Sequence, residues 1–153
     1  MLITAVSIDT NGDIYSIGGT SKDESINDGK NSDHKISKVD GTVLWKWKPD
    51  LGYSEVKSKG VVIDKNGTVY VMADTSLYAI NGSTGQTAWS MQNVIPECDT
   101  SNSSIAVLDD GNILVTASDT TSNGSNESNA LLINNSSQEI IWDYNTNVGG
   151  NRS

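Results

Sequence analysis

Residues 61–70 read Val61-Val62-Ile63-Asp64-Lys65-Asn66-Gly67-Thr68-Val69-Tyr70, two short apolar runs on either side of an Asn-Gly pair. An Asn-Gly pair tolerates the positive φ angles of a tight hairpin turn, and β-branched and aliphatic residues suit a packed pleated surface. The stretch therefore predicts a β-hairpin. Related stretches precede and follow it in the chain.

The hairpin pattern occurs three times. Its first copy is Ala5-Val6-Ser7-Ile8-Asp9-Thr10-Asn11-Gly12-Asp13-Ile14-Tyr15, and its third is Ala106-Val107-Leu108-Asp109-Asp110-Gly111-Asn112-Ile113-Leu114. We therefore expect Gly12, Gly67 and Gly111 to occupy equivalent turns with a structural role.

A second element follows each hairpin and ends on a tryptophan. It covers residues 35–45, 77–89 and 131–142, so that Trp45, Trp89 and Trp142 close the three copies. In the middle copy Gly85 belongs to a Thr-Gly turn, where the third copy has the degenerate run 134–137, Asn-Asn-Ser-Ser. A unit of about four strands in about 40–50 residues is the size of one β-propeller blade.

The sequence thus predicts an all-β fold of three four-stranded antiparallel β-propeller blades in a single partial propeller domain over residues 1–153. The blades are expected at about residues 3–48, 58–91 and 103–144. Because propellers have about four to eight blades, three leave two apolar blade faces open. Either the chain is a fragment of a longer protein, which its start in a first strand favours, or identical chains complete the ring, for example as two arcs giving six blades.

The middle unit carries the clearest family resemblance. Its residues 67–71, 77–80 and 84–86, together with Trp89, resemble the repeat of quinoprotein (PQQ-like) β-propellers, and the first unit resembles the repeats of bacterial secreted seven-bladed propellers. The resemblance implies that Trp45, Trp89 and Trp142 pack between blades. Trp47 is interpreted either as blade packing or as an exposed edge. The resemblance also favours an extracytoplasmic location, although the N-terminal residues have no signal-peptide pattern.

Two polar insertions distinguish the outer units from the middle one. They cover residues 19–33 and 118–129, where the middle unit has only residues 73–76. Resemblance to propellers places both on the face that binds ligands, and the plainer alternative is a pair of solvated loops. The candidate partner-binding residues in or beside them are Asp23, Glu24, Asp28, Asp33, His34, Asp119, Asn123 and Glu127. The carboxylates of the first insertion lack the spacing of an EF-hand, so no metal site is predicted.

Composition excludes several classes of function. A net charge of -9 removes the positive surface that binding to nucleic acid or to an anionic membrane requires, and no apolar run is long enough to span a membrane. Cys98 is the single cysteine, so no disulfide can form within the chain. The single histidine, His34, is expected in the first insertion, and no Ser-His-Asp or Cys-His arrangement is evident around it.

These patterns favour a non-catalytic β-propeller that serves as a binding or assembly scaffold. Its expected partners are further blades, in a longer chain or a homo-oligomer, and an unidentified protein or small molecule. The alternative is a fragment of a propeller enzyme such as a quinone-dependent dehydrogenase. The resemblance implies that such an enzyme holds pyrroloquinoline quinone and calcium with adjacent cysteines, a tryptophan platform and carboxylates from many blades. With one cysteine and three blades, this chain is predicted to bind no cofactor by itself.

Overall fold

The computed structural model describes residues 2–19, 32–49, 60–73, 75–95, 103–120 and 126–147. These ranges form strands, turns and irregular segments, with no helix, and therefore no helix with the length and apolar character needed to cross a membrane. The prediction of an all-β fold is confirmed.

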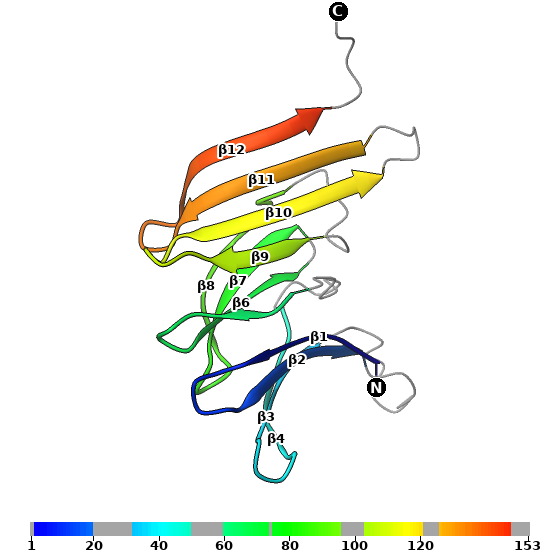
Figure 1. The fold of residues 1–153 in the computed structure, drawn as a ribbon, viewed down its shortest axis with the longest axis vertical. Coiled ribbons are helices and arrows are strands. Elements are labelled where there is room, and N and C mark those ends of the chain that lie inside the picture. Colours follow the sequence, from blue (N-terminus) through cyan, green and yellow to red (C-terminus); the bar gives the residue numbers. More distant parts are fainter. Residues whose placement is uncertain are drawn as a thin grey trace, which may run out of the picture.

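The strands of these ranges form three four-stranded antiparallel sheets, each a meander in chain order (Figure 1). The first sheet contains β1 (Leu2–Ile8), β2 (Ile14–Gly19), β3 (Ser32–Ile36) and β4 (Val43–Trp47). The middle sheet contains β5 (Val62–Ile63), β6 (Thr68–Ala73), β7 (Ser76–Asn81) and β8 (Thr87–Met91). The third sheet contains β9 (Ser104–Val107), β10 (Ile113–Thr120), β11 (Asn126–Asn134) and β12 (Glu139–Asn147). The predicted three four-stranded antiparallel sheets are thus confirmed.

The hairpin turns that open the first two sheets are built alike. The Asp64 Oδ1 atom accepts hydrogen bonds from the backbone N–H groups of Asn66 (2.9 Å) and Thr68 (2.8 Å), and Gly67 has a φ of 81°. Asp9 plays the same part in the β1–β2 turn. The carboxylate satisfies turn N–H groups that the strand ladder leaves unpaired, and glycine adopts the positive φ at little cost.

The turn before the last strand is also conserved in geometry between the middle and third sheets. The side-chain oxygen of Asn81 accepts from the N–H groups two and three residues further on, and that of Asn134 does the same. Gln138, with a φ of 54°, takes the place of Gly85, with a φ of 72°. The run that the sequence marks as degenerate therefore keeps the turn, because asparagine caps it locally.

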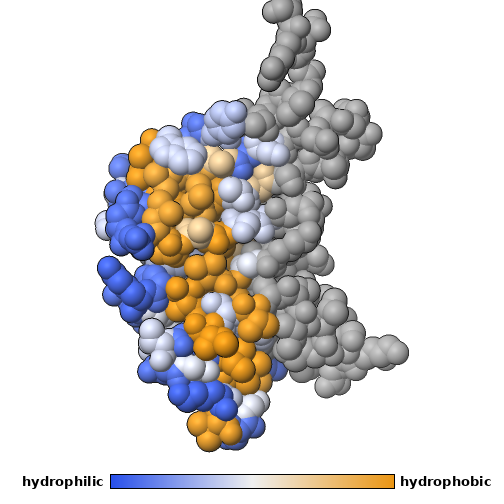
Figure 2. All heavy atoms as spheres, in the orientation of Figure 1, coloured by the Kyte–Doolittle hydropathy of each residue, from blue (hydrophilic) through white to orange (hydrophobic). Residues whose placement is uncertain are grey.

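The middle sheet lies between the other two and is covered on both faces. Residues 69–73 and 76–80 of β6 and β7 are buried throughout. Side chains facing the first sheet pack with Tyr15 and Trp47, and those facing the third pack with Ile113, Ile133 and their neighbours. Figure 2 shows apolar residues gathered along the centre of the stack, with hydrophilic residues on the rim that carries the hairpin turns. Burial on two faces explains why β6 is a continuous apolar run rather than an alternating one.

The two tryptophans of β4 pack between the first and middle sheets. The Trp45 Nε1 atom donates to the Gly82 carbonyl (3.0 Å). Trp47 is 4% exposed; its ring lies 5.0 Å from that of Tyr78, and its Nε1 atom donates to Thr87 Oγ1 (2.8 Å). Of the two interpretations of Trp47, packing between sheets is therefore the correct one.

The equivalent tryptophans of the other sheets differ in exposure. Trp89 of β8 is half-buried and packs against the cluster between the middle and third sheets, 6.0 Å from the Tyr70 ring. Trp142 of β12 is 43% exposed. Its surroundings differ because the third sheet is followed by no further sheet in the described ranges.

Candidate functional site

Half of the predicted partner-binding residues lie in strands rather than loops. Asp33 and His34 belong to β3, where His34 pairs with Ser16 of β2 and Lys46 of β4. The expectation that His34 lies in the first insertion is therefore wrong, because β3 already begins at Ser32.

The second insertion is likewise shorter than the sequence predicts. Asp119 of β10 and Glu127 of β11 are cross-strand partners in a hairpin, where the sequence predicts an insertion loop. Backbone pairing extends into polar residues because each strand of a ladder satisfies the other's N–H and C=O groups whatever the side chains are. The remaining candidates, Asp23, Glu24, Asp28 and Asn123, lie outside the described residues, as does Cys98.

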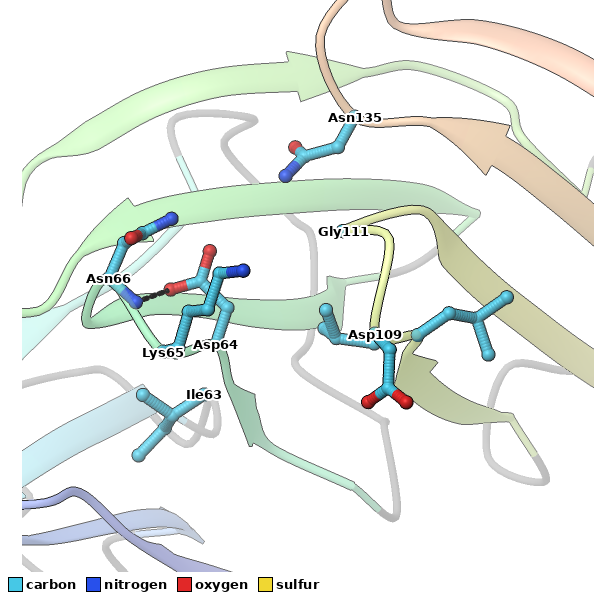
Figure 3. Close-up of a pocket in the computed structure, with 9 residues that line it drawn as sticks. Ile63, Asp64, Lys65, Asn66, Asp109, Gly111 and Asn135 are labelled. Carbon is cyan, nitrogen blue, oxygen red and sulfur yellow. Dashed lines mark hydrogen bonds between the residues drawn. The ribbon is translucent and has the colours of Figure 1, made fainter.

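A cleft of about 300 Å³ opens between the turns of the middle and third sheets (Figure 3). Its walls are residues 63–66 of the β5–β6 turn, residues 107–109 and Gly111 of the β9–β10 turn, and Asn135 of the β11–β12 turn. The sequence predicts no partner-binding role for these residues, because each already has a role in a hairpin or its turn. The signal that marks the cleft is the departure of the third copy from the repeat, with Leu108 and Leu114 at the positions of an aspartate and a tyrosine.

A hydrogen-bonded chain through Tyr70 joins two residues that line this cleft, Asn135 and Asp64. Asn135 Nδ2 donates to the Tyr70 hydroxyl (2.8 Å), and that hydroxyl donates to Asp64 Oδ2 (3.2 Å). Burial and the nearby charge of Asp64 raise the pKa of Tyr70 above its ordinary value of 10.0, so its hydroxyl is a stable donor at neutral pH. The chain links the third sheet to the middle sheet, and both oxygens of Asp64 are already engaged.

A tyrosine hydroxyl also links the first sheet to the middle sheet. The Tyr15 hydroxyl lies 3.1 Å from Asp9 Oδ2 and 3.2 Å from the carbonyl oxygen of Gly82, and can donate to either. Gly82 follows Asn81 as Asn135 follows Asn134, so the two tyrosines contact equivalent turns.

Lys35 adds a buried charge cluster to this first contact. Its Nζ atom lies 3.4 Å from Asp9 Oδ2, 3.2 Å from Asp13 Oδ2 and 5.1 Å from the centroid of the Tyr15 ring. Burial alone lowers the pKa of Lys35, but hydrogen bonds and charge from Tyr15, Asp13 and Asp9 outweigh it and raise the pKa above 10.5. A nucleophilic or basic lysine needs a lowered pKa, so this ammonium acts as a counter-ion and not as a reacting group.

Asp9 responds to the same neighbours in the opposite sense. Burial raises the pKa of its carboxyl, but hydrogen bonds from the Asp13 N–H, the Tyr15 hydroxyl and Lys35 together hold the pKa below 3.8. Asp9 is therefore ionised at neutral pH. Among the residues that the structure describes, no three His, Cys, Asp or Glu side chains gather in a way that could hold a metal ion.

No family model and no curated protein matches the chain. The likeness to quinoprotein repeats therefore rests on the residues of the repeat themselves.

Proposed function

We propose that the chain is a non-catalytic β-propeller scaffold, in which the three sheets are successive blades that provide surfaces for assembly and binding. The observation that carries this proposal is the repetition of one contact between sheets. Tyr15 reaches the Gly82 turn of the middle sheet, and Tyr70 reaches the equivalent Asn135 turn of the third. In a β-propeller, each blade packs on the next in the same way around a central axis, so the same contact repeats along the chain.

The placement of the first strands supports the same arrangement. In the described ranges β5 lies against β1 on one side and against β9 on the other. First strands that line up in this way are suited to the inner rim of a propeller, with β4, β8 and β12 outermost.

The polar groups at the two sheet contacts favour a scaffold over an enzyme. Asp9, Asp64, Tyr70 and Lys35 are all occupied in turns or in links between sheets. The alternative, a fragment of a quinone-dependent dehydrogenase, draws only on the repeat resemblance. Titration with pyrroloquinoline quinone and calcium, followed by tryptophan fluorescence, separates the two: the scaffold predicts no change, and saturable quenching would favour the enzyme.

The blade arrangement has its own test. Thr10, Lys65 and Asp109 occupy equivalent turn positions in the three sheets. Spin labels at pairs of these positions, in a Cys98→Ser background, report three distances by pulsed electron resonance. In a ring, the distance between neighbouring labels is the Thr10–Lys65 or the Lys65–Asp109 distance. For about six to eight blades, the Thr10–Asp109 distance is about 1.7 to 1.85 times that neighbouring distance. A ratio of about 2, as in a straight stack of sheets, would refute the propeller arrangement.

A further inference from the structure

We propose that two copies of this chain associate head to tail. The outer face of the third sheet of each copy packs on the outer face of the first sheet of the other, and together the copies close a ring of six sheets. This inference rests on the proposed function, because it takes the sheets to be blades.

The outer face of the third sheet, which we name the tryptophan face, is defined by strand register. Cross-strand partners project on the same side of a sheet. One row runs Ala106, Leu114, Leu132 and Trp142, and the row beyond it includes Tyr144. The intervening row is buried against the middle sheet, so the tryptophan face points away from it. Trp142 and Tyr144 are exposed, and Leu114 and Leu132 are partly exposed.

In the other two sheets the equivalent row covers the next sheet. In the middle sheet this row is Val62, Tyr70, Ala79 and Trp89, which packs on the third sheet. In the first sheet it is Ser7, Tyr15, Lys35 and Trp45, and its Tyr15 and Trp45 pack on the middle sheet. The tryptophan face of the third sheet is thus the face that, twice within the chain, packs on a following sheet.

The outer face of the first sheet, which we name the isoleucine face, is the complementary surface. Its row is Ile8, Ile14, Ile36 and Val43. Ile8, Val6 and Val43 on this face are 63%, 56% and 48% exposed, whereas Ile14 and Ile36 are partly buried and Ser16, the partner of Val6, is 0% exposed.

The equivalent rows elsewhere receive a preceding sheet. They are Ile63, Val69, Ile80 and Thr87 in the middle sheet, and Val107, Ile113, Ile133 and Ile140 in the third. Val69 and Ile80 are fully buried under Tyr15 and Trp47, and Ile113 and Ile133 are fully buried under the middle sheet. The described residues therefore expose one tryptophan face and the outer-strand parts of one isoleucine face, the two halves of an interface that they already form twice.

Buried area decides between head-to-tail and like-with-like pairing. Four strands about 4.8 Å apart and about five residues of about 3.3 Å make each face about 300 Å². A two-copy ring buries up to four such faces, at most about 1,200 Å² in total, which reaches the lower end of stable specific interfaces. Pairing one kind of face with itself buries about half of that, the size of a crystal contact. Three copies would make nine sheets, beyond the usual range of about four to eight.

The contact between copies differs from the internal ones in one respect. Leu108 and Leu114 replace the aspartate and tyrosine of the first two sheets, so the hydrogen bond to the receiving turn is absent from this contact. We therefore expect a reversible dimer held by apolar contact, and one that strengthens with salt because each copy carries a net charge of -9.

Sedimentation of the full chain with matched substitutions tests the inference. Trp142→Lys alters the tryptophan face, Ile8→Lys alters the isoleucine face, and Val39→Lys, at an 85% exposed turn position, makes the same charge change on neither face. We expect the unsubstituted chain and Val39→Lys to be dimers, and the two face variants to dimerise about tenfold or more weakly. Circular dichroism should show an unchanged β-sheet spectrum for all three variants.

Mixing the two face variants gives the decisive result. The Ile8→Lys copy keeps its tryptophan face and the Trp142→Lys copy keeps its isoleucine face, so a mixed pair has one intact contact. An equal mixture should therefore dimerise more tightly than either variant alone, and more weakly than the unsubstituted chain. Loss of the dimer in one face variant alone would show like-with-like pairing and overturn the inference, as would unlimited polymers or a monomer at submillimolar concentration. A monomer whose spin-label distances still give the ring ratio would overturn self-association and leave the proposed function standing.

Discussion

Two buried tyrosines of the middle sheet provide a matched pair of substitutions. Tyr70 and Tyr78 are 1% and 3% exposed, and each ring packs beside a tryptophan. The Tyr70 hydroxyl makes two hydrogen bonds, to Asp64 and from Asn135, whereas the Tyr78 hydroxyl has no hydrogen-bond partner among the residues that the structure describes. Replacing either residue by phenylalanine keeps the ring and removes only the oxygen and its proton.

The two substitutions should differ clearly in free energy of unfolding. A hydrogen bond to a charged group contributes about 1.5–3 kcal/mol and a neutral one about 1 kcal/mol, so Tyr70→Phe should destabilise the chain by about 2–4 kcal/mol. Removing a buried hydroxyl that has no partner relieves its desolvation cost, so Tyr78→Phe should be neutral or stabilise by about 1 kcal/mol. A loss of 2–4 kcal/mol is a large part of the roughly 5–15 kcal/mol that stabilises a domain.

Urea unfolding at one protein concentration, followed by tryptophan fluorescence and by circular dichroism, measures both variants. The slope of free energy against urea should match that of the unsubstituted chain, which shows that the same surface is exposed on unfolding. Equal losses for the two variants, or a larger loss for Tyr78→Phe, would refute the assignment of the Asn135–Tyr70–Asp64 chain as the link between the middle and third sheets.

Two further predictions concern the first sheet and its contact with the middle sheet. Because the pKa of Lys35 is raised in the folded chain, its stabilisation is complete below pH 10.5 and declines as the pH rises further. Lys35→Met should therefore show a shallower alkaline loss of unfolding free energy than the unsubstituted chain, and equal slopes would contradict this. Gly41 and Gly85 have φ angles of 73° and 72°, but an added Cβ meets nothing within 4 Å at Gly41, whereas at Gly85 it comes 2.7 Å from Trp45. Gly41→Ala should cost about 1–2 kcal/mol in backbone strain, and Gly85→Ala about 1–3 kcal/mol more in thermal or urea unfolding; equal costs would show that Trp45 does not pack there.

The locally encoded features are those that the sequence predicts well. Gly12, Gly67 and Gly111 have positive φ angles in hairpin turns, because a two-sided apolar pattern with Asn-Gly or Asp-Gly specifies a turn within a few residues. Local chemistry also explains the turn of the third sheet, where Asn134 replaces the cap of Asn81 and Gln138 adopts the left-handed conformation. That equivalence could have been read from the aligned copies.

Strand ends in polar segments were harder to predict. His34, Asp119 and Glu127 are strand residues, although their neighbours have the composition of loops. Backbone pairing depends on the partner strand, and side-chain composition near a hairpin end says little about how far the ladder extends. The cleft beside Asn135 was missed for a related reason, since it is formed by turns from three hairpins that are separate in the sequence.

The apolar parts of the strands, the hairpin turns and the two-residue alternation that assigns side chains to opposite faces of each sheet all follow from local sequence. Which of those faces are covered follows from the packing of the sheets on one another. Trp47 and Trp142 both lie on last strands, yet Trp47 is 4% exposed and Trp142 is 43% exposed. The physical reason is that alternation follows from backbone geometry within one strand, whereas burial depends on whether another sheet packs against that face.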